Sequence, residues 1–256
     1  MALTQAQVDA FVSDGFVHLA GAVPSARARR CRDEIWQAIG YDPDDASTWA
    51  DTLVRLPLMA TPPFQEAANS PDLHEAFDQL VGPGRWERRT GLGTFPLRFP
   101  GPGPAKEAGW HVEASFVGPD GRMRVDLGSR GRALLMLFLF SDVGDDDAPT
   151  RIRVGSHRAV ARILAPAGEG GLSIRALAAA DRFASTASCP EATATGPAGT
   201  VYLCHPFLVH AAQRHRGTQP RFMAQPPLYP ARPYDVASGG SPVEVAIRDA
   251  LDQPAG

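Results

Sequence analysis

Apolar residues recur at helical spacing in several stretches, most of them before residue 86. In the first stretch, Thr4 and Gln7 form a capping-box pattern ahead of the apolar residues Val8 and Phe11, and Gly15 is expected to end the helix. A short strand is predicted at residues 16–19. Three more helices are expected, the first capped by Ser25, the second started by Ser70 and the third capped by Ser241.

From about residue 86 the pattern changes to short apolar runs separated by clusters of Gly, Pro and Asp. These runs predict strands at residues 92–99, 110–116, 122–127, 133–143, 200–205 and 222–228. Strands that follow a helical block indicate a mainly β fold with flanking helices, a barrel or sandwich braced by N-terminal helices. Residues 168–199, rich in small residues, are expected to form a long crossover or a lid.

The predicted elements fit one domain over residues 1–256. It comprises a helical part at about 1–85, a β core at about 86–230 and a C-terminal helix at about 241–252. A hydrophobic content of 44% and a charged content of 21% are typical of a globular protein. The 25 glycines and 24 prolines are dispersed, which indicates turns and not disorder.

Charge and cysteine content exclude several classes of partner. A net charge of −3 without a basic run gives no basis for nucleic-acid binding. The three cysteines form no CxxC pair, and no signal peptide is recognised, so a cytoplasmic location is expected. The longest apolar stretch, residues 133–140, is too short to cross a bilayer, and no membrane association is predicted.

The stretch with the clearest chemical character contains His111 and Glu113. Side chains two positions apart on an extended strand point to the same side, which would place an imidazole and a carboxylate together. That pair suits a divalent metal, although His-x-Glu is common by chance.

A third ligand and an anion-binding residue are available downstream. His205 and His210 are both candidates, and each is followed at the same separation by an arginine, Arg216 or Arg221. Arg216 lies in a polar turn, whereas Arg221 opens an apolar strand and would be held rigidly. The sequence therefore favours His210 with Arg221. Two histidines and one carboxylate form the facial triad of non-haem Fe(II) oxygenases, and a guanidinium can bind a carboxylate through two hydrogen bonds.

With these residues in place, the chain resembles the phytanoyl-CoA dioxygenase family. The resemblance is carried by the Leu-Thr-x-x-Gln start, Asp14-Gly15-Phe16-Val17, His111-Val112-Glu113, Pro149-Thr150, Gly155-Ser156-His157, and His210 with Arg221. It implies a double-stranded β-helix, the jelly-roll or cupin-like core. It also implies Fe(II) bound by His111, Glu113 and His210, with O₂ as a substrate. Arg221 would bind the distal carboxylate of the co-substrate 2-oxoglutarate, with Arg98 nearby.

Two further expectations concern single segments. Gly155-Ser156-His157 is expected to turn between strands, with His157 structural, and Trp110 to form a wall of the pocket. The family usually carries Asp where this chain has Glu113, so one additional methylene must be accommodated. A carboxylate at that position also argues against the halogenating relatives.

The expected reaction is hydroxylation of a C–H bond of a small molecule, with release of succinate and CO₂. Redox-neutral, metal-dependent cupin-type enzymes and a non-catalytic family member are the alternatives. The substrate is expected to be a secondary metabolite or an amino-acid-like compound, and the oligomeric state stays open.

Overall fold

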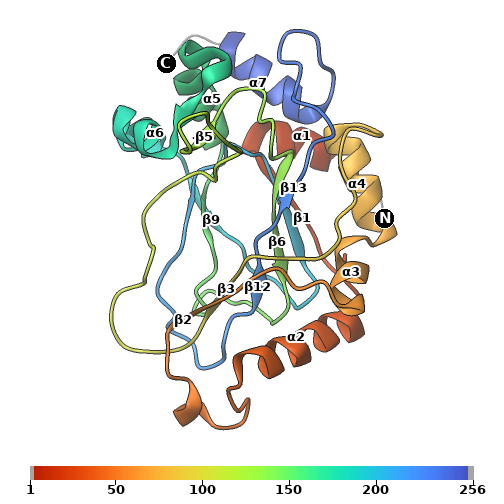
Figure 1. Ribbon diagram of the computed structural model, residues 1–256, viewed down its shortest axis with the longest axis vertical. Coiled ribbons are helices and arrows are strands. Elements are labelled where there is room, and N and C mark those ends of the chain that lie inside the picture. The colour runs from red at the N-terminus through yellow and green to blue at the C-terminus, as the bar shows by residue number, and fades with distance from the viewer. Residues whose placement is uncertain (1–2, 253–256) are drawn as a thin grey trace.

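Helices cover both ends of a set of antiparallel sheets in the computed structural model, which describes residues 3–252 (Figure 1). The helices are α1 (Gln5–Asp14), α2 (Ser25–Ile39), α3 (Pro62–Ala68), α4 (Pro71–Val81), α5 (Ser156–Leu164), α6 (Ile174–Asp181) and α7 (Pro242–Asp252). The strands are β1 (Phe16–Leu19), β2 (Leu53–Leu56), β3 (Phe95–Arg98), β4 (Phe116–Val117), β5 (Met123–Val125), β6 (Leu134–Leu139), β7 (Arg151–Arg153), β8 (Leu172–Ser173), β9 (Glu191–Thr193), β10 (Val201–Cys204), β11 (His210–Ala211), β12 (Met223–Ala224) and β13 (Pro227–Leu228).

The largest sheet has five strands in the order β1-β10-β6-β12, with β13 also paired to β6. A second sheet has the order β11-β7-β9, and smaller sheets are formed by β2-β3 and by β4-β5-β8. Isolated bridges between Arg98 and Arg221 and between His111 and His210 connect these parts. Both bridges involve residues that the sequence singles out, so the sheets bring the candidate site together.

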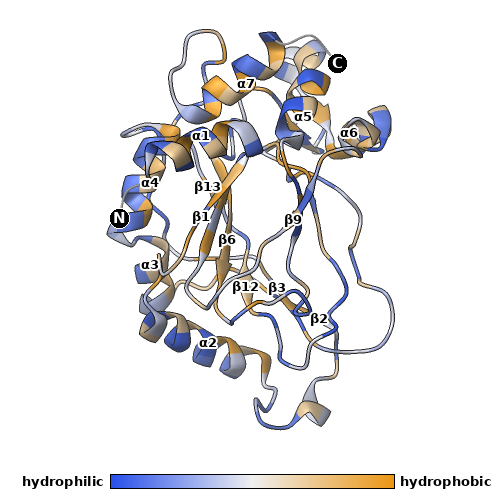
Figure 2. Cartoon of the chain, turned by 180° about the vertical axis from the view of Figure 1, so that it is seen from behind, coloured by the Kyte–Doolittle hydropathy of each residue, from blue (hydrophilic) through white to orange (hydrophobic). Residues whose placement is uncertain are grey.

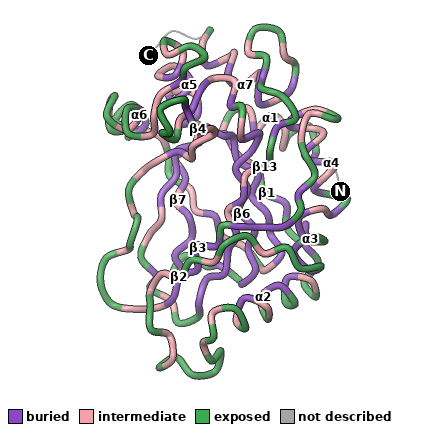
Figure 3. The backbone as a smooth tube through the Cα atoms, viewed as in Figure 1, coloured by how far each residue is buried: buried purple, intermediate pink, exposed green. Residues whose placement is uncertain are grey.

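Strand β6 is buried along both faces and separates two hydrophobic cores. Met136 and Phe138 belong to the larger core, which includes the apolar faces of the helices. Leu137 and Leu139 belong to a smaller core that also contains Ile152 of β7. The region around β6 is apolar and buried, whereas the outer turns of α2 are exposed (Figures 2 and 3). Each buried Leu, Met or Phe contributes roughly 1.5–3 kcal/mol, so this sheet is the rigid centre of the fold.

The helix ends follow local capping chemistry. Thr4 and Gln7 form the predicted capping box at the start of α1, and Gly15, with φ of 86°, ends that helix. Ser70 caps α4 by accepting a hydrogen bond from the backbone N–H of Leu73. The sequence prediction is confirmed at each of these ends.

Two predicted helix and turn boundaries are wrong. Ser25 does not cap α2: the capping position is Pro24, and Ser25 is already the first helical residue. Gly155-Ser156-His157 does not turn between strands. Gly155, with φ of 77°, precedes helix α5, which begins at Ser156, so this motif is a helix start that follows β7.

Two segments also differ from the expected pattern. Residues 110–116 do not form a continuous strand: His111 makes one bridge to His210, and only Phe116 enters a strand, β4. Residues 168–199 are not merely a crossover or lid, because they contain α6 and also β9, which pairs with β7. The second sheet is therefore completed by a segment that the sequence assigned to a crossover or a lid.

Helices and antiparallel sheets are both present, as the sequence predicts. Among residues 3–252, no helix combines the length and the apolar character that a membrane span requires.

Candidate metal centre

His111 and His210 lie opposite each other on neighbouring extended segments. The backbone N–H of each donates to the carbonyl oxygen of the other at 3.0 Å, and the centroids of the two imidazole rings are 4.4 Å apart. This reciprocal bridge fixes the register of the segment that carries His111 against β11. The two rings therefore meet although the residues are far apart in the sequence.

A backbone carbonyl orients each imidazole. Nδ1 of His111 is 2.8 Å from the carbonyl oxygen of Gly109, and Nδ1 of His210 is 3.0 Å from that of Leu208. Because a carbonyl can only accept, Nδ1 carries a proton in both rings, and Nε2 is the atom that can bind a metal once it carries none. Both Nε2 atoms lie 3.8 Å from Oε1 of Glu113. The tautomers are those that metal-binding histidines require.

Glu113 completes a set of three side chains that could hold a metal ion. Ligand atoms of His111, Glu113 and His210 all lie within 4.8 Å of one another. Burial alone would raise the pKa of Glu113, but the two imidazoles and the guanidinium of Arg132 lower it, so the carboxylate is ionised. Two neutral imidazoles and one carboxylate suit a divalent transition metal and leave coordination positions open. The residues present thus fit a metal ion.

Arg221 and Arg98 lie side by side in the same cavity. Their backbones form a reciprocal bridge, and only 1% of Arg221 and 4% of Arg98 is exposed. The guanidinium of Arg221 donates to the carbonyl oxygens of Ala148 at 2.7 Å and Pro96 at 2.9 Å. Burial, and secondarily the charge on Arg98, lowers the pKa of Arg221 to about 9. Within residues 3–252, neither arginine forms an ion pair with a carboxylate, so both are suited to bind an anion.

The cavity that contains these residues has a volume of about 740 Å³. Trp110, Met123 and Ile174 contribute apolar walls, which confirms that Trp110 faces the cavity. The indole ring of Trp110 is in turn contacted by the guanidinium groups of Arg151 at 4.6 Å and Arg153 at 4.2 Å from its centroid. This packing fixes Trp110, the residue that precedes His111 in the sequence, against strand β7.

The alternative pair His205 and Arg216 does not reach the centre. His205 is fully buried beside Phe11 and His157, and its Nδ1 accepts from the backbone N–H of Phe207. Arg216 forms an ion pair with Asp146 near the surface. Of the residues that the structure describes, only His111, Glu113 and His210 form a cluster suited to a metal ion.

Two residues beside Glu113 were missed by sequence reasoning. The side-chain amide of Gln225 donates to Oε1 of Glu113 at 2.8 Å, and Nη2 of Arg132 lies 3.8 Å from Oε2. Gln225 could have been found by alternation, because residues 221, 223 and 225 share one side of an extended segment. No sequence signal indicates Arg132, which approaches from a separate turn.

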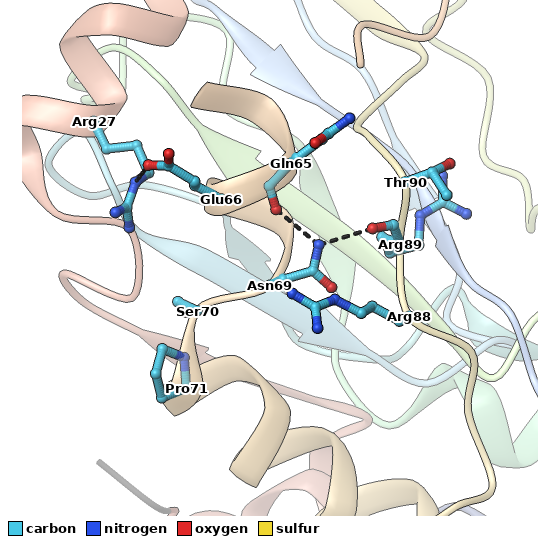
Figure 4. A pocket seen from close by; sticks show the side chains of 9 residues that line it. All are labelled: Arg27, Gln65, Glu66, Asn69, Ser70, Pro71, Arg88, Arg89 and Thr90. Atoms are coloured by element: carbon cyan, nitrogen blue, oxygen red, sulfur yellow. Dashed lines mark hydrogen bonds and ion pairs between the residues drawn. The ribbon is translucent and has the colours of Figure 1, made fainter. Parts of the chain in front are cut away.

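A second cavity, of about 520 Å³, lies between α2, the α3–α4 junction and residues 88–90 (Figure 4). Several of its polar side chains already have partners: Arg27 pairs with Glu66, and the Asn69 amide donates to the carbonyl oxygens of Gln65 and Arg89. It contains no cluster of metal-binding side chains among the described residues.

Solved structures share this fold at low sequence identity. HygX from Streptomyces hygroscopicus, solved with nickel and 2-oxoglutarate, is 20% identical with a TM-score of 0.57 over 88% of this chain and 86% of that one. SnoN, a non-haem α-ketoglutarate-dependent epimerase of nogalamycin biosynthesis, is 15% identical with a TM-score of 0.56 over 86% and 80% of the chains. SnoK, a carbocyclase from the same biosynthesis, is 16% identical with a TM-score of 0.55 over 87% and 82%.

A search of curated proteins found no significant match. The family model of phytanoyl-CoA dioxygenase, in contrast, matches residues 11–223. The match includes all five candidate site residues: Arg98, His111, Glu113, His210 and Arg221. The chain therefore belongs to the phytanoyl-CoA dioxygenase family, a family of non-haem iron enzymes that use 2-oxoglutarate.

Proposed function

We propose that the protein is an Fe(II)- and 2-oxoglutarate-dependent dioxygenase that hydroxylates a C–H bond of a small molecule. The observation that carries the proposal is the presence, in one cavity, of a His–Glu–His cluster and a buried arginine without a carboxylate partner. A metal ion and a dicarboxylic co-substrate are the ligands that such a combination fits.

His111, Glu113 and His210 would hold the iron, and Arg221 would bind the distal carboxylate of 2-oxoglutarate. Bound iron would supply the site for oxidation by O₂, in which one oxygen atom enters succinate, formed from 2-oxoglutarate with loss of CO₂, and the other enters the substrate. The backbone carbonyls of Gly109 and Leu208 keep the lone pairs of both Nε2 atoms directed into the site. Arg98 contributes a second positive charge beside Arg221, which favours a dianionic co-substrate.

The apolar walls support a small organic substrate whose reacting carbon is shielded from water. HygX has been solved with hygromycin B and SnoN with nogalamycin RO, so relatives of this fold bind secondary metabolites. SnoN and SnoK are an epimerase and a carbocyclase, so similar folds also support outcomes other than hydroxylation. We propose hydroxylation here, with a secondary metabolite or an amino-acid-like compound as substrate.

We also propose that the two larger sheets form the jelly-roll core expected for the family. The support is the smaller hydrophobic core, in which leucines of β6 contact Ile152 of β7. The β11-β7-β9 sheet would then be the layer opposite β6, and the metal centre would lie at one end of that sandwich.

Release of succinate tests the proposed function against a redox-neutral cupin-type reaction. The Fe(II)-loaded protein is incubated with 2-oxoglutarate, O₂ and a panel of candidate metabolites, and succinate is quantified. We expect at least one metabolite to stimulate succinate release and to gain one oxygen atom in its mass. Conversion of a metabolite without succinate would overturn the proposal.

A further inference from the structure

We propose that Gln225 and Arg132 are positioning residues that hold the carboxylate of Glu113 from two sides and thereby fit the metal centre to a glutamate. The inference rests on the proposed function, because it assumes that Glu113 is a metal ligand. It concerns two residues outside the ligand set and explains how the additional methylene of Glu113 is accommodated.

Gln225 holds the side of the carboxylate that faces the histidines. Its Nε2 donates to Oε1 of Glu113 at 2.8 Å and lies 3.3 Å from Nε2 of His210. Its own backbone N–H donates to the carbonyl oxygen of Thr94 at 2.8 Å, which ties this segment to residues next to β3. Because Nε2 of His210 is a proposed ligand atom, only the hydrogen bond to Glu113 is compatible with a bound metal.

Arg132 holds the opposite side. Its Nη2 lies 3.8 Å from Oε2 of Glu113, and its Nε donates to the carbonyl oxygen of Ala114 at 3.2 Å. The side chain is 10% exposed, and its Nη1 has no hydrogen-bond partner. The guanidinium is therefore buried beside Glu113, with no other carboxylate paired to it among the described residues. The turn before it approaches closely, since a Cβ on Gly131 would lie 1.6 Å from the carbonyl oxygen of Ser115.

The two contacts define where the carboxylate must be. An aspartate at position 113 would withdraw its oxygens by about 1.5 Å, one carbon–carbon bond. It could then reach the metal or the two holding groups, but not both in the present backbone. An amide that loses its acceptor and a buried guanidinium that loses its nearby carboxylate both cost free energy, so these two contacts favour the longer side chain.

Cobalt(II) binding to the metal-free protein under anaerobic conditions tests the inference without requiring turnover. Affinity is obtained by titration, and the ligand field is read from the visible absorption of the bound ion. Removing groups that orient metal ligands typically weakens affinity 10- to 100-fold, and we expect a loss of about that size in Gln225→Leu. Gln79→Leu is the matched control: Gln79 is also partly buried and pairs through its amide with the backbone of Leu3, remote from the cavity. Its affinity should match the wild type.

A double-mutant cycle separates positioning from general destabilisation. Glu113→Asp should weaken cobalt binding about tenfold or more in the wild-type background, but clearly less in the Gln225→Leu background, because the contact it breaks is already absent. Equal losses in both backgrounds would overturn the role of Gln225, as would an unchanged affinity and spectrum in Gln225→Leu.

Arg132 is tested in the same way with Arg132→Met and Arg132→Lys, and lysine should recover part of the affinity that methionine loses. If Arg132→Met does not fold, the Lys variant decides: affinity for cobalt(II) identical to the wild type would remove the requirement for the guanidinium. Failure of the proposed function is distinguishable: succinate release by the wild-type protein reports on the function, whereas the inference is read from cobalt(II) affinity, and a wild-type protein that binds no cobalt(II) would remove the metal site itself.

Discussion

At the scale of single residues, the most unusual group is the guanidinium of Arg221. It is 1% exposed and adjacent to a second buried cation, Arg98, yet its partners are neutral carbonyl groups. Burial of a charge without a counter-ion costs several kcal/mol, and such a cost is offset when an anionic ligand binds. We therefore propose that Arg221 contributes to co-substrate affinity and not to the stability of the ligand-free fold.

Replacing Arg221 with Leu should lower affinity for 2-oxoglutarate about 100-fold, since loss of one partner from a buried charged pair costs roughly 2–5 kcal/mol. Affinity is measured by titrating 2-oxoglutarate into the anaerobic Fe(II) protein. Arg221→Lys keeps the charge but lacks the planar guanidinium, so its affinity for 2-oxoglutarate should lie between those of the wild type and Arg221→Leu. Unchanged affinity in Arg221→Leu would remove the assigned role.

Residue-level prediction from the sequence succeeded where neighbours in sequence, or a family motif, carry the geometry. The side chains of His111 and Glu113 lie together as predicted, although the continuous strand assumed for residues 110–116 is absent. His210 and Arg221 were chosen from their position at a strand boundary. Arg132 could not be predicted, because its contact with Glu113 depends on how a turn from another segment packs.

At the scale of elements, the segment that carries Glu113 is positioned by a close backbone approach. Gly131 faces the carbonyl oxygen of Ser115 at a distance that no side chain would permit. The backbone N–H of Ser115 in turn donates to the carbonyl oxygen of Arg124 in β5 at 2.8 Å. The small β4-β5-β8 sheet and the 129–132 turn thus fix this part of the centre.

Gly131→Ala should push these two segments apart. We expect a loss of roughly 1–3 kcal/mol in the free energy of unfolding, typical of overpacking, together with weaker metal binding. Urea denaturation and cobalt(II) titration measure the two effects. Gly170→Ala serves as control, because a Cβ there meets nothing within 4 Å. Equal stability of both variants would contradict the close approach.

Element-level prediction worked best for long periodic stretches. The capped helices α1 and α4 and the central strand β6 were predicted because their apolar spacing is strong and their ends carry capping or turn residues. The two-residue strand β11 is too short for a periodic signal, and β9 forms because it pairs with the edge of β7. Such elements are set by tertiary pairing and not by local sequence.

At the scale of the whole molecule, a buried histidine ties the N-terminal helix to the sheets. His157 of α5 is fully buried, and its Nε2 donates to the carbonyl oxygen of Val12 in α1 at 3.2 Å. Its ring packs against His205 at the end of β10, with centroids 4.8 Å apart. Burial lowers the pKa of His157 to about 3 from an ordinary value of 6.5.

Stability should therefore fall in mild acid. The unfolded chain takes up a proton on His157 below about pH 6.5, whereas the folded protein does so only near pH 3, so stability is present above pH 6.5 and is lost as the pH falls between these values. Between pH 7 and pH 5 this residue should cost about 2 kcal/mol, measured by urea denaturation. His157→Gln, which does not titrate, should show a smaller decrease. An identical decrease in both proteins would assign the acid sensitivity elsewhere.

The central claim, that one cavity holds Fe(II) and 2-oxoglutarate together, is tested most directly by anaerobic absorption spectroscopy. Adding 2-oxoglutarate to the Fe(II)-loaded protein should produce a metal-to-ligand charge-transfer band, which should be absent in His210→Ala and require much more 2-oxoglutarate in Arg221→Leu. No band in the wild-type protein, despite bound iron, would contradict the claim.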